Sequence, residues 1–313
     1  MVTLIEELAR SYGYEEKSAA EYGSEGEVVL SCFDGISCGQ EALRRLGVKV
    51  STYYASEVDP YAIKVTQANF PFTVQLGDIK KVHVNDHIDI LLGGPPCQDV
   101  SYAGKGKGLI EGSRSSLFFE FVRVLREAQA INPGLKFLVE NTKMKKEYVD
   151  IISAILGVKP VLINSNVFSA QNRARLYWTN FKIPELPGDK GIILADILED
   201  EVDSRYHVGK KLVATYRGGD QLSPNYTSQS NTIHSLHKKS PALCAGTHGY
   251  ALGYICKTVA DNIIYRRLTP LECERLQTLP DNFTAHVSNT QRYKGIGNGW
   301  TVDVICHILG GLK

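Results

Sequence analysis

The sequence predicts an α/β protein built on a mostly parallel, doubly wound sheet, with one antiparallel edge strand and a smaller inserted lobe. Two observations predict this fold class. Apolar, β-prone segments alternate with helical segments between residues 27 and 181, and such alternation joins parallel strands through right-handed crossovers. The alternation stops near Pro184, and regular segments return only after residue 260. A polar lobe therefore interrupts the sheet domain.

The expected elements follow from the spacing of apolar residues. Strands are predicted at 27–33, 51–57, 73–79, 87–94, 134–141, 160–168 and 174–181, and helices at 41–47, 60–70, 115–131 and 147–157. The last two strands are separated by a short link, so one of them is expected to be antiparallel at the edge. The predicted domains are an N-terminal extension (1–26), a catalytic and cofactor-binding domain (27–180), a target-recognition lobe (181–260) and a C-terminal return (261–313).

Composition narrows the class of protein. The chain has 313 residues, 43% hydrophobic and 22% charged, which is ordinary for a soluble globular protein. Its seven cysteines include no CxxC pair and no Cys/His pair at zinc spacing, so we expect reduced thiols and no metal. No apolar run suits a membrane span, and the first residues do not resemble a signal peptide. We expect a cytoplasmic, nucleoid-associated protein in a prokaryote or virus, and a nuclear one in a eukaryote.

The net charge is only +1, but the positive charges are unevenly distributed along the chain. Residues 204–260 contain seven Lys or Arg and one acid. A local excess of this kind is typical of a surface that binds a polyanion such as nucleic acid. A solvated basic loop region is the alternative.

Several predicted strands end in residues that suit a ligand, at the edge where open α/β sheets bind one. The turn after the first strand carries Gly35 and Gly39, but their spacing is not that of a dinucleotide-binding GxGxxG motif. Glu57 ends the second strand, where a carboxylate often binds ribose hydroxyls. Asp78 ends the third and could accept from an adenine amino group. The set predicts an adenosine ligand without a pyrophosphate, and S-adenosylmethionine fits.

The fourth strand ends in "GGPPC", which places Cys97 on a stiff turn at the same edge. A buried small hydrophobe is the alternative, and a cysteine protease lacks a suitable His partner. Glu140 ends the fifth strand. Arg173 and Arg175 have one residue between them, so on a strand both side chains would point to the same face. They could form a structural ion network or serve an anionic substrate.

These side chains match the needs of methylation at C5 of cytosine. That reaction requires a thiolate that adds to C6, and Cys97 fits. It also requires a partner at the N3/N4 edge, and Glu140 fits. Arg173 and Arg175 would orient Glu140 and contact the target phosphate or the base O2. The base must leave the duplex, and the basic lobe at 204–260 is the candidate for gripping the DNA.

The motifs "FDGISCG", "GGPPCQDVS", "VENT", "QNRARLYW", "RRLTPLECERLQTLPDNF" and "GIGNGWTV" occur in this order. The chain resembles the DNA (cytosine-5) methyltransferases, and "SEVD", "LFFEF" and "HVSN" resemble the catalytic domain of the de novo enzymes. The resemblance implies a Rossmann-like methyltransferase fold, S-adenosylmethionine as cofactor, double-stranded DNA as partner, and Cys97, Glu140, Arg173 and Arg175 as catalytic residues. A homo-oligomer or a regulatory partner is left open. Thr142 stands where the family more commonly has the valine of "ENV". The last motif, "GNGWTV", combines the usual bacterial "GNS" form with a tryptophan typical of the de novo enzymes.

The resemblance also implies the cofactor contacts, which come from both ends of the chain. They are Phe33, Asp34, Gly35, Ile36, Cys38, Glu57, Val58, Asp78, Ile79, Gly94, Pro96, Leu117, Asn298 and Trp300. For DNA it implies Gln98 and Ser101. The basic side chains of the glycine-rich loop 104–116 and of the lobe complete the predicted DNA-binding set: Lys105, Lys107, Arg114, Arg205, Arg217, Lys238 and Lys239. That loop suits a mobile lid.

The sequence disfavours three other functions. A tRNA-methylating branch shares "PPCQ" and "EN", but its "CFT" signature is missing from the predicted lobe. A non-catalytic regulatory module would be expected to lose the cysteine or the cofactor-loop residues, and both are present. An adenine methyltransferase would carry a "PPY" or "PPF" loop where this chain has "GPPC".

Overall fold

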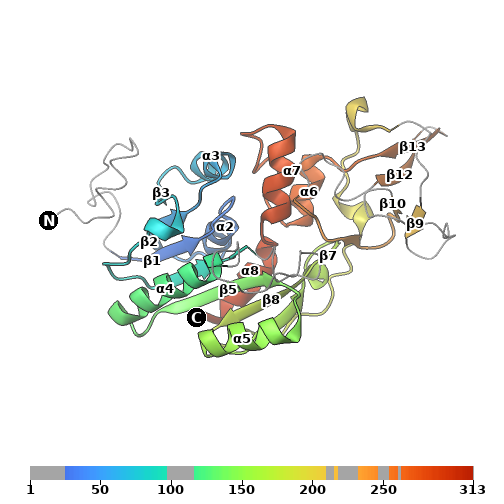
Figure 1. Cartoon of the computed structure of the whole chain (residues 1–313). Helices are drawn as coiled ribbons and strands as arrows, with labels where there is room; N and C mark the ends of the chain where they lie inside the picture. Colours follow the sequence, from blue (N-terminus) through green and yellow to red (C-terminus); the bar gives the residue numbers. More distant parts are fainter. Residues whose placement is uncertain are drawn as a thin grey trace. The chain divides into compact units, whose positions relative to one another are not determined.

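The computed structural model describes residues 25–96, 116–208, 215–217, 232–245, 254–259 and 262–312 (Figure 1). The chain divides into two compact units, the first formed by 1–163, 174–184 and 305–313, and the second by 164–173 and 185–304. This grouping differs from the predicted limits at 181 and 261. Residues 164–173 and 262–266 join the second unit because their strands pair with strands of that unit.

The first unit is built on a seven-stranded sheet in the order β3-β2-β1-β4-β5-β8-β6. Its strands are β1 (Glu27–Cys32), β2 (Val50–Ser56), β3 (Val74–Gln75), β4 (Ile90–Gly93), β5 (Lys136–Thr142), β6 (Val161–Asn164) and β8 (Ala174–Thr179). The pairs from β3 to β5 are parallel, whereas β8 is antiparallel to β5. The predicted antiparallel strand is present, one position in from the edge. The helical crossover after β5 carries the chain to β6, and β8 fills the position between them.

Helices cover both faces of this sheet (Figure 1). They are α2 (Cys38–Arg45), α3 (Pro60–Asn69), α4 (Ser116–Ile131), α5 (Lys146–Leu156) and α8 (Val302–Leu309). The main core cluster joins the strands to α4 and α5 through side chains such as Leu91, Phe121 and Ile152. Asp59 caps α3 by accepting from the Tyr61 N–H, and Pro60 occupies the first turn, where a missing N–H costs nothing. The core therefore holds the carboxyl ends of β1, β2 and β4 on rigid elements.

Gly93 is required by close packing at the end of β4. A Cβ at this position would lie 2.4 Å from Cε2 of Phe121, whose ring is fully buried. Gly93→Ala is expected to cost about 1–3 kcal/mol of unfolding free energy through overpacking, measured by urea denaturation. Phe121→Leu in the same chain should recover part of this loss. Gly188→Ala, where a Cβ meets nothing within 4 Å, should change stability little; equal losses in the two alanine variants would contradict the explanation.

The second unit carries a four-stranded sheet in the order β13-β12-β10-β9. Its elements are β9 (Thr215–Arg217), β10 (Thr232–His234), β12 (Tyr254–Val259), β13 (Asn262–Arg266), the pair β7 (Gln171–Asn172) and β11 (Ser240–Pro241), and the helices α6 (Pro270–Leu276) and α7 (Asn289–Asn298). A reciprocal capping box between Thr269 and Glu272 starts α6. Leu194, Leu268, Leu276 and Ile296 belong to its core.

Short 3₁₀ turns complete both units: η2 (Ile79–Lys81), η3 (Ser165–Val167), η4 (Leu194–Ile197), η5 (Ser204–Tyr206) and η7 (Gly310–Leu312). Among the described residues, no helix is long and apolar enough to cross a membrane. The same part of the chain contains no group of three or more His, Cys, Asp or Glu side chains that could hold a metal ion.

Candidate functional site

The loop after β1 has an unusual backbone that its neighbours hold in place. Phe33, Gly35 and Ser37 all adopt left-handed conformations, with φ of 59°, 59° and 57°. Such a conformation is costly for Phe and Ser and persists only where surrounding structure enforces it, often at functional sites. The Phe33 N–H donates to the Ser56 carbonyl at 2.8 Å. The Gly35 N–H donates to Glu57 Oε2 at 2.8 Å. The loop is thus tied to the end of β2.

Glu57 organises two segments at once. Besides Gly35, its Oε1 accepts from the N–H groups of Val58 at 2.7 Å and Asp59 at 2.8 Å. A carboxylate can accept about four hydrogen bonds, so one position is left for a ligand hydroxyl. A Cβ added at Gly35 would meet no atom within 4 Å, so the backbone there faces open space. These two features fit the predicted ligand at this edge.

Asp34 is the titratable group of this loop. Its carboxylate accepts from the Tyr53 hydroxyl at 2.8 Å and from the Ser37 hydroxyl. Burial raises the pKa of Asp34 to about 6, while hydrogen bonds from Ser31, Ser37 and Tyr53 act to lower it and the Glu57 charge adds to the rise. The carboxyl therefore titrates close to neutrality.

This pKa predicts a pH-dependent stability. The ordinary pKa of an Asp carboxyl is about 3.9. A carboxyl whose pKa is raised in the folded state contributes its full stabilisation only when the pH is below this ordinary pKa. The contribution is lost as pH rises through about 6. We expect the unfolding free energy of the wild type to fall between about pH 4 and about pH 6 relative to that of Asp34→Asn, measured by urea denaturation. Parallel pH profiles for the two proteins would contradict the assignment.

Asp78 and Ile79 form the start of η2 at the end of the β3 segment. Asp78 Oδ1 accepts from the Lys80 N–H at 3.1 Å, and Oδ2 has no hydrogen-bond partner among the described residues. Ile79 is buried, with 3% of its surface exposed. Asp78 thus keeps a free acceptor at the edge where the adenine amino group was predicted.

The other predicted cofactor residues of the first unit differ in exposure. Val58 is the most exposed, at 67%, whereas Ile36 and Cys38 are buried. Gly94, Pro96 and Leu117 are partly buried. The side chains of Ile36 and Cys38 therefore pack inside the unit, so any ligand contact there would involve their main chain.

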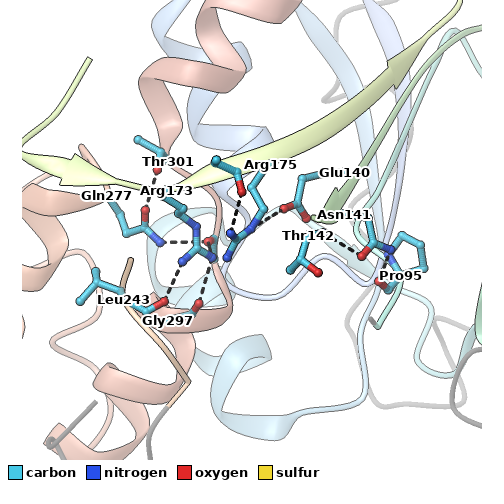
Figure 2. Close-up of polar contacts among 12 residues, drawn as sticks. Pro95, Glu140, Asn141, Thr142, Arg173, Arg175, Leu243, Gln277, Gly297 and Thr301 are labelled. Atoms are coloured by element: carbon cyan, nitrogen blue, oxygen red, sulfur yellow. Dashed lines mark hydrogen bonds and ion pairs between the residues drawn. The ribbon is translucent and has the colours of Figure 1, made fainter. Parts of the chain in front are cut away.

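Glu140 and Arg175 form the central ion pair of the first unit (Figure 2). Arg175 Nε lies 3.0 Å from Glu140 Oε1, and the two side chains are only 16% and 12% exposed. Arg175 Nη1 also donates to its neighbour, the Ala174 carbonyl, at 3.0 Å. The predicted orientation of Glu140 by Arg175 is therefore present, in a partly desolvated position.

Asn141 connects this pair to the segment that carries Cys97. Its Nδ2 donates to the Pro95 carbonyl at 3.3 Å, and its Oδ1 accepts from the Thr142 N–H at 2.8 Å (Figure 2). Pro95 is two residues before Cys97, so the last turn of the β4 segment is anchored to β5. Cys97 itself lies outside the described residues, as do Gln98, Ser101, Lys105, Lys107 and Arg114.

Arg173 differs from Arg175 in its surroundings. It precedes β8 and belongs to the second unit, so the expectation that both arginines sit on one strand is wrong. Its buried guanidinium donates to the carbonyls of Leu243 at 2.8 Å, Gly297 at 3.0 Å and Gly299 at 3.0 Å (Figure 2). These contacts favour a structural role, because the side chain joins three segments of the second unit.

Two buried glutamines, which we did not predict, support the same region. Gln171 Nε2 donates to Gln277 Oε1 at 3.1 Å, and Gln171 Oε1 accepts from the Leu243 N–H at 2.7 Å. Gln277 Nε2 donates to the Gly299 carbonyl at 3.0 Å, and the Thr301 hydroxyl donates to Gln277 Oε1 at 2.7 Å (Figure 2). The signal available in the sequence was a glutamine inside "RLQTL", since an amide among apolar residues is costly unless paired.

Asn298 and Trp300 flank Gly299 in the second unit. Asn298 is exposed at the end of α7, and Trp300 is partly buried. A Cβ at Gly297 would lie 2.3 Å from the Cys244 carbonyl oxygen, so only glycine allows this close approach. The turn that carries Asn298 is therefore fixed by Arg173, Gln277 and this packing.

The predicted DNA-binding residues that are described fall into two groups. Arg205 and Lys238 are exposed, and Arg217 lies in β9. Lys239 is different: its Nζ donates to the carbonyls of Asn166 at 2.6 Å and Ile192 at 3.0 Å and to Asp189 Oδ1 at 2.9 Å. The prediction that Lys239 contacts DNA is corrected, because its ammonium group is used inside the second unit.

Comparison with known proteins decides the family. Residues 28–313 match the model of the C-5 cytosine-specific DNA methylases. The chain is 32% identical over 283 residues to the type II methyltransferase M1.ScrFI of Lactococcus lactis subsp. cremoris, covering 82% of this chain and 70% of that protein. It is 30% identical over 314 residues to M.HhaI of Haemophilus parahaemolyticus, covering 89% and 92%. The chain belongs to the C-5 cytosine-specific DNA methylase family.

Solved structures agree on the fold. Spodoptera frugiperda DNMT2 (as a triple mutant) superposes with a TM-score of 0.67 at 20% identity, covering 91% of this chain and 99% of that one. Entamoeba histolytica EhMeth gives 0.67 at 16% identity, covering 93% and 100%. The predicted Rossmann-like methyltransferase fold is confirmed. The protein is a DNA (cytosine-5) methyltransferase, and its family and fold imply S-adenosylmethionine as methyl donor and DNA as substrate.

Proposed function

We propose that this DNA methyltransferase methylates C5 of a flipped-out cytosine through a covalent bond between Cys97 and C6. The observation that carries the proposal is the Glu140–Arg175 pair, with 3.0 Å between Arg175 Nε and Glu140 Oε1. Glu140 lies on β5, and the next residue of that strand, Asn141, donates to the Pro95 carbonyl in "GPPC". A carboxylate held by an arginine and a cysteine thiol are the two groups that the addition requires, and Cys97 follows the anchored Pro95 by two residues in the sequence.

The Cys97 thiolate forms a bond to C6, and the C5–C6 π electrons make C5 nucleophilic while Glu140, at the N3/N4 edge, stabilises the charge that develops on the ring. C5 then gains the methyl group, whose bond to the sulfonium sulfur breaks with both electrons left on that sulfur. A base removes the C5 proton, the C5–H electrons restore the C5–C6 double bond, and the C6–S bond breaks to restore the thiolate. Arg175 holds Glu140 in place through Nε, and its Nη2 would contact the base O2 or the target phosphate. Such fixed electrostatic partners supply much of an enzyme's rate enhancement.

S-adenosylmethionine would be held by the first unit at the ends of β1, β2 and β3. Glu57 would accept from the ribose, Asp78 Oδ2 from the adenine amino group, and the backbone at Gly35 would approach the ligand closely, because a Cβ there meets no atom within 4 Å. Asn298 and Trp300 are proposed to add contacts from the C-terminal segment. When bound, the cofactor supplies an electrophilic methyl group on a sulfonium.

Double-stranded DNA is proposed to bind along the basic lobe at 204–260 and the loop 104–116. The supporting observation is the local excess of seven basic residues over one acid between 204 and 260. Arg205, Arg217 and Lys238 stay in the proposed set with Gln98, Ser101, Lys105, Lys107 and Arg114, and Lys239 does not. Extruding a base from duplex DNA costs a few kcal/mol, which these contacts would offset.

The test is transfer of radiolabelled methyl from S-adenosylmethionine to mixed-sequence duplex DNA and, in parallel, to total tRNA. We expect label in DNA as 5-methylcytosine and none in the Cys97→Ser variant. Label in tRNA alone would replace DNA by RNA as the substrate. Bound S-adenosylmethionine without label in either nucleic acid would contradict the catalytic proposal.

A further inference from the structure

Two side chains of α4, Arg123 and Glu127, hold the segment that follows Asp78. Arg123 Nη2 donates to the Ile79 carbonyl at 2.9 Å, and Nη1 donates to the Val82 carbonyl at 2.8 Å. Glu127 Oε2 accepts from the Val84 N–H at 2.9 Å. Every contact is between a charged side chain and a main-chain group, and such hydrogen bonds are stronger than neutral ones. The segment 79–84 is therefore fixed along its length by one helix.

We call Arg123 and Glu127 the clamp, and ion pairs within α4 hold these two side chains in place. Arg123 Nη1 lies 2.8 Å from Glu127 Oε1, and Arg123 Nε lies 2.9 Å from Glu120 Oε2. Burial acts to raise the pKa of Glu127, but the hydrogen bonds from Val84 and Arg123 outweigh it, so the pKa lies below its ordinary value. Glu127 is thus a carboxylate at neutral pH. The planar fork of Arg123 meets two carbonyls and two carboxylates, which a lysine could not do.

We propose that Arg123 and Glu127 are positioning residues that set the adenine selectivity of this methyltransferase by holding Asp78 and Ile79. The inference rests on the proposed cofactor site. η2 begins at Ile79, whose carbonyl is the acceptor of Arg123, and Asp78 Oδ2 is the acceptor offered to the 6-amino group. A shift of this short turn would move that oxygen directly, because one ångström is enough to break a hydrogen bond.

The position of α4 explains why the helix suits this role. Phe121, two residues before Arg123, packs on Gly93 at the end of β4, so that face of the helix is seated against the sheet. Leu117, in the first turn, belongs to the proposed cofactor pocket and packs against the same core cluster. One helix therefore contacts both the η2 segment, through Arg123 and Glu127, and the end of β4, through Phe121.

The experiment compares binding of S-adenosylhomocysteine and S-inosylhomocysteine by calorimetry, without DNA. The inosine ring presents an oxygen where adenine presents its amino group, so a well-placed carboxylate should prefer adenine by about 10- to 100-fold. Arg123→Met should lose about 10-fold in affinity for S-adenosylhomocysteine and change little for S-inosylhomocysteine. The affinity of Arg123→Lys for S-adenosylhomocysteine should lie between those of the wild type and Arg123→Met. Arg126→Met, an exposed arginine of the same helix, should behave as wild type.

A second readout separates positioning from general damage. At saturating S-adenosylmethionine, kcat for DNA methylation by Arg123→Met should stay within about 3-fold of wild type, while the KM for S-adenosylmethionine rises about 10-fold. Equal losses for both nucleosides, or unchanged selectivity, would overturn the clamp while leaving the proposed reaction intact. Failure of the wild type to bind S-adenosylhomocysteine would overturn the cofactor site and the clamp with it. If Arg123→Met does not fold, the comparison is made with Arg123→Lys.

Discussion

Glu140→Gln is expected to lower kcat for methyl transfer by about 10²- to 10⁴-fold, the range attributed to a positioned acid–base or hydrogen-bonding group. Glutamine keeps the length and shape of the side chain but removes the charge that Arg175 holds at 3.0 Å. Because both side chains are largely buried, the change leaves Arg175 without its counter-charge in a partly desolvated site. The effect should therefore appear in the chemical step rather than in cofactor binding.

The measurement is single-turnover methylation with saturating duplex DNA, together with calorimetric binding of S-adenosylhomocysteine. The matched control is Glu147→Gln, which removes a carboxylate that is 60% exposed and lies 3.7 Å from Lys145. We expect the control to keep wild-type rates. Retention of more than about a tenth of the wild-type rate by Glu140→Gln, with normal binding, would remove Glu140 from the proposed mechanism.

The sheet could be predicted from the sequence because its signals are local. The strands β1, β4 and β5 each contain a short apolar run followed by a glycine or polar residues, and such a run is the sequence signal of a buried strand. The site residues at strand ends, such as Glu57 and Glu140, followed from the same rule, since parallel strands end at one edge. The hydrogen-bond partners of a side chain at a strand end are harder to predict from the sequence. The three backbone N–H groups that donate to Glu57 could not be inferred.

The contrasting surroundings of two arginines and one lysine show where sequence reasoning stops. Arg173 and Arg175 looked equivalent from their spacing, but a compact-unit boundary falls between them. Lys239 looked like its exposed neighbour Lys238, yet its ammonium group binds carbonyls far away in the chain. The partners of Arg173, and most of those of Lys239, are main-chain carbonyls, which every residue carries. Long-range pairing of this kind depends on the folded backbone and leaves no pattern in the residue types.

The second large effect is expected from the buried ion pair at the start of α6. Glu272 is fully buried and Arg266 is 3% exposed. Arg266 donates to Glu272 at 2.6 Å and 2.8 Å. Glu272 also accepts from the N–H groups of Thr269 at 2.8 Å and Glu199 at 3.0 Å. One carboxylate therefore joins β13, the α6 cap and the segment after η4.

Glu272→Gln is expected to lower the unfolding free energy by about 3–5 kcal/mol, because breaking a buried pair leaves the remaining charge uncompensated. Urea denaturation would measure it. The matched control is Asp281→Asn at the surface pair, where Arg275 binds Asp281 at 2.6 Å and 2.9 Å. Exposed pairs contribute only about 0.2–1 kcal/mol. The double change Arg266→Met with Glu272→Leu should recover part of the loss, since apolar side chains remove both buried charges. If the single change at Glu272 costs no more than the one at Asp281, the pair does not hold α6 in place.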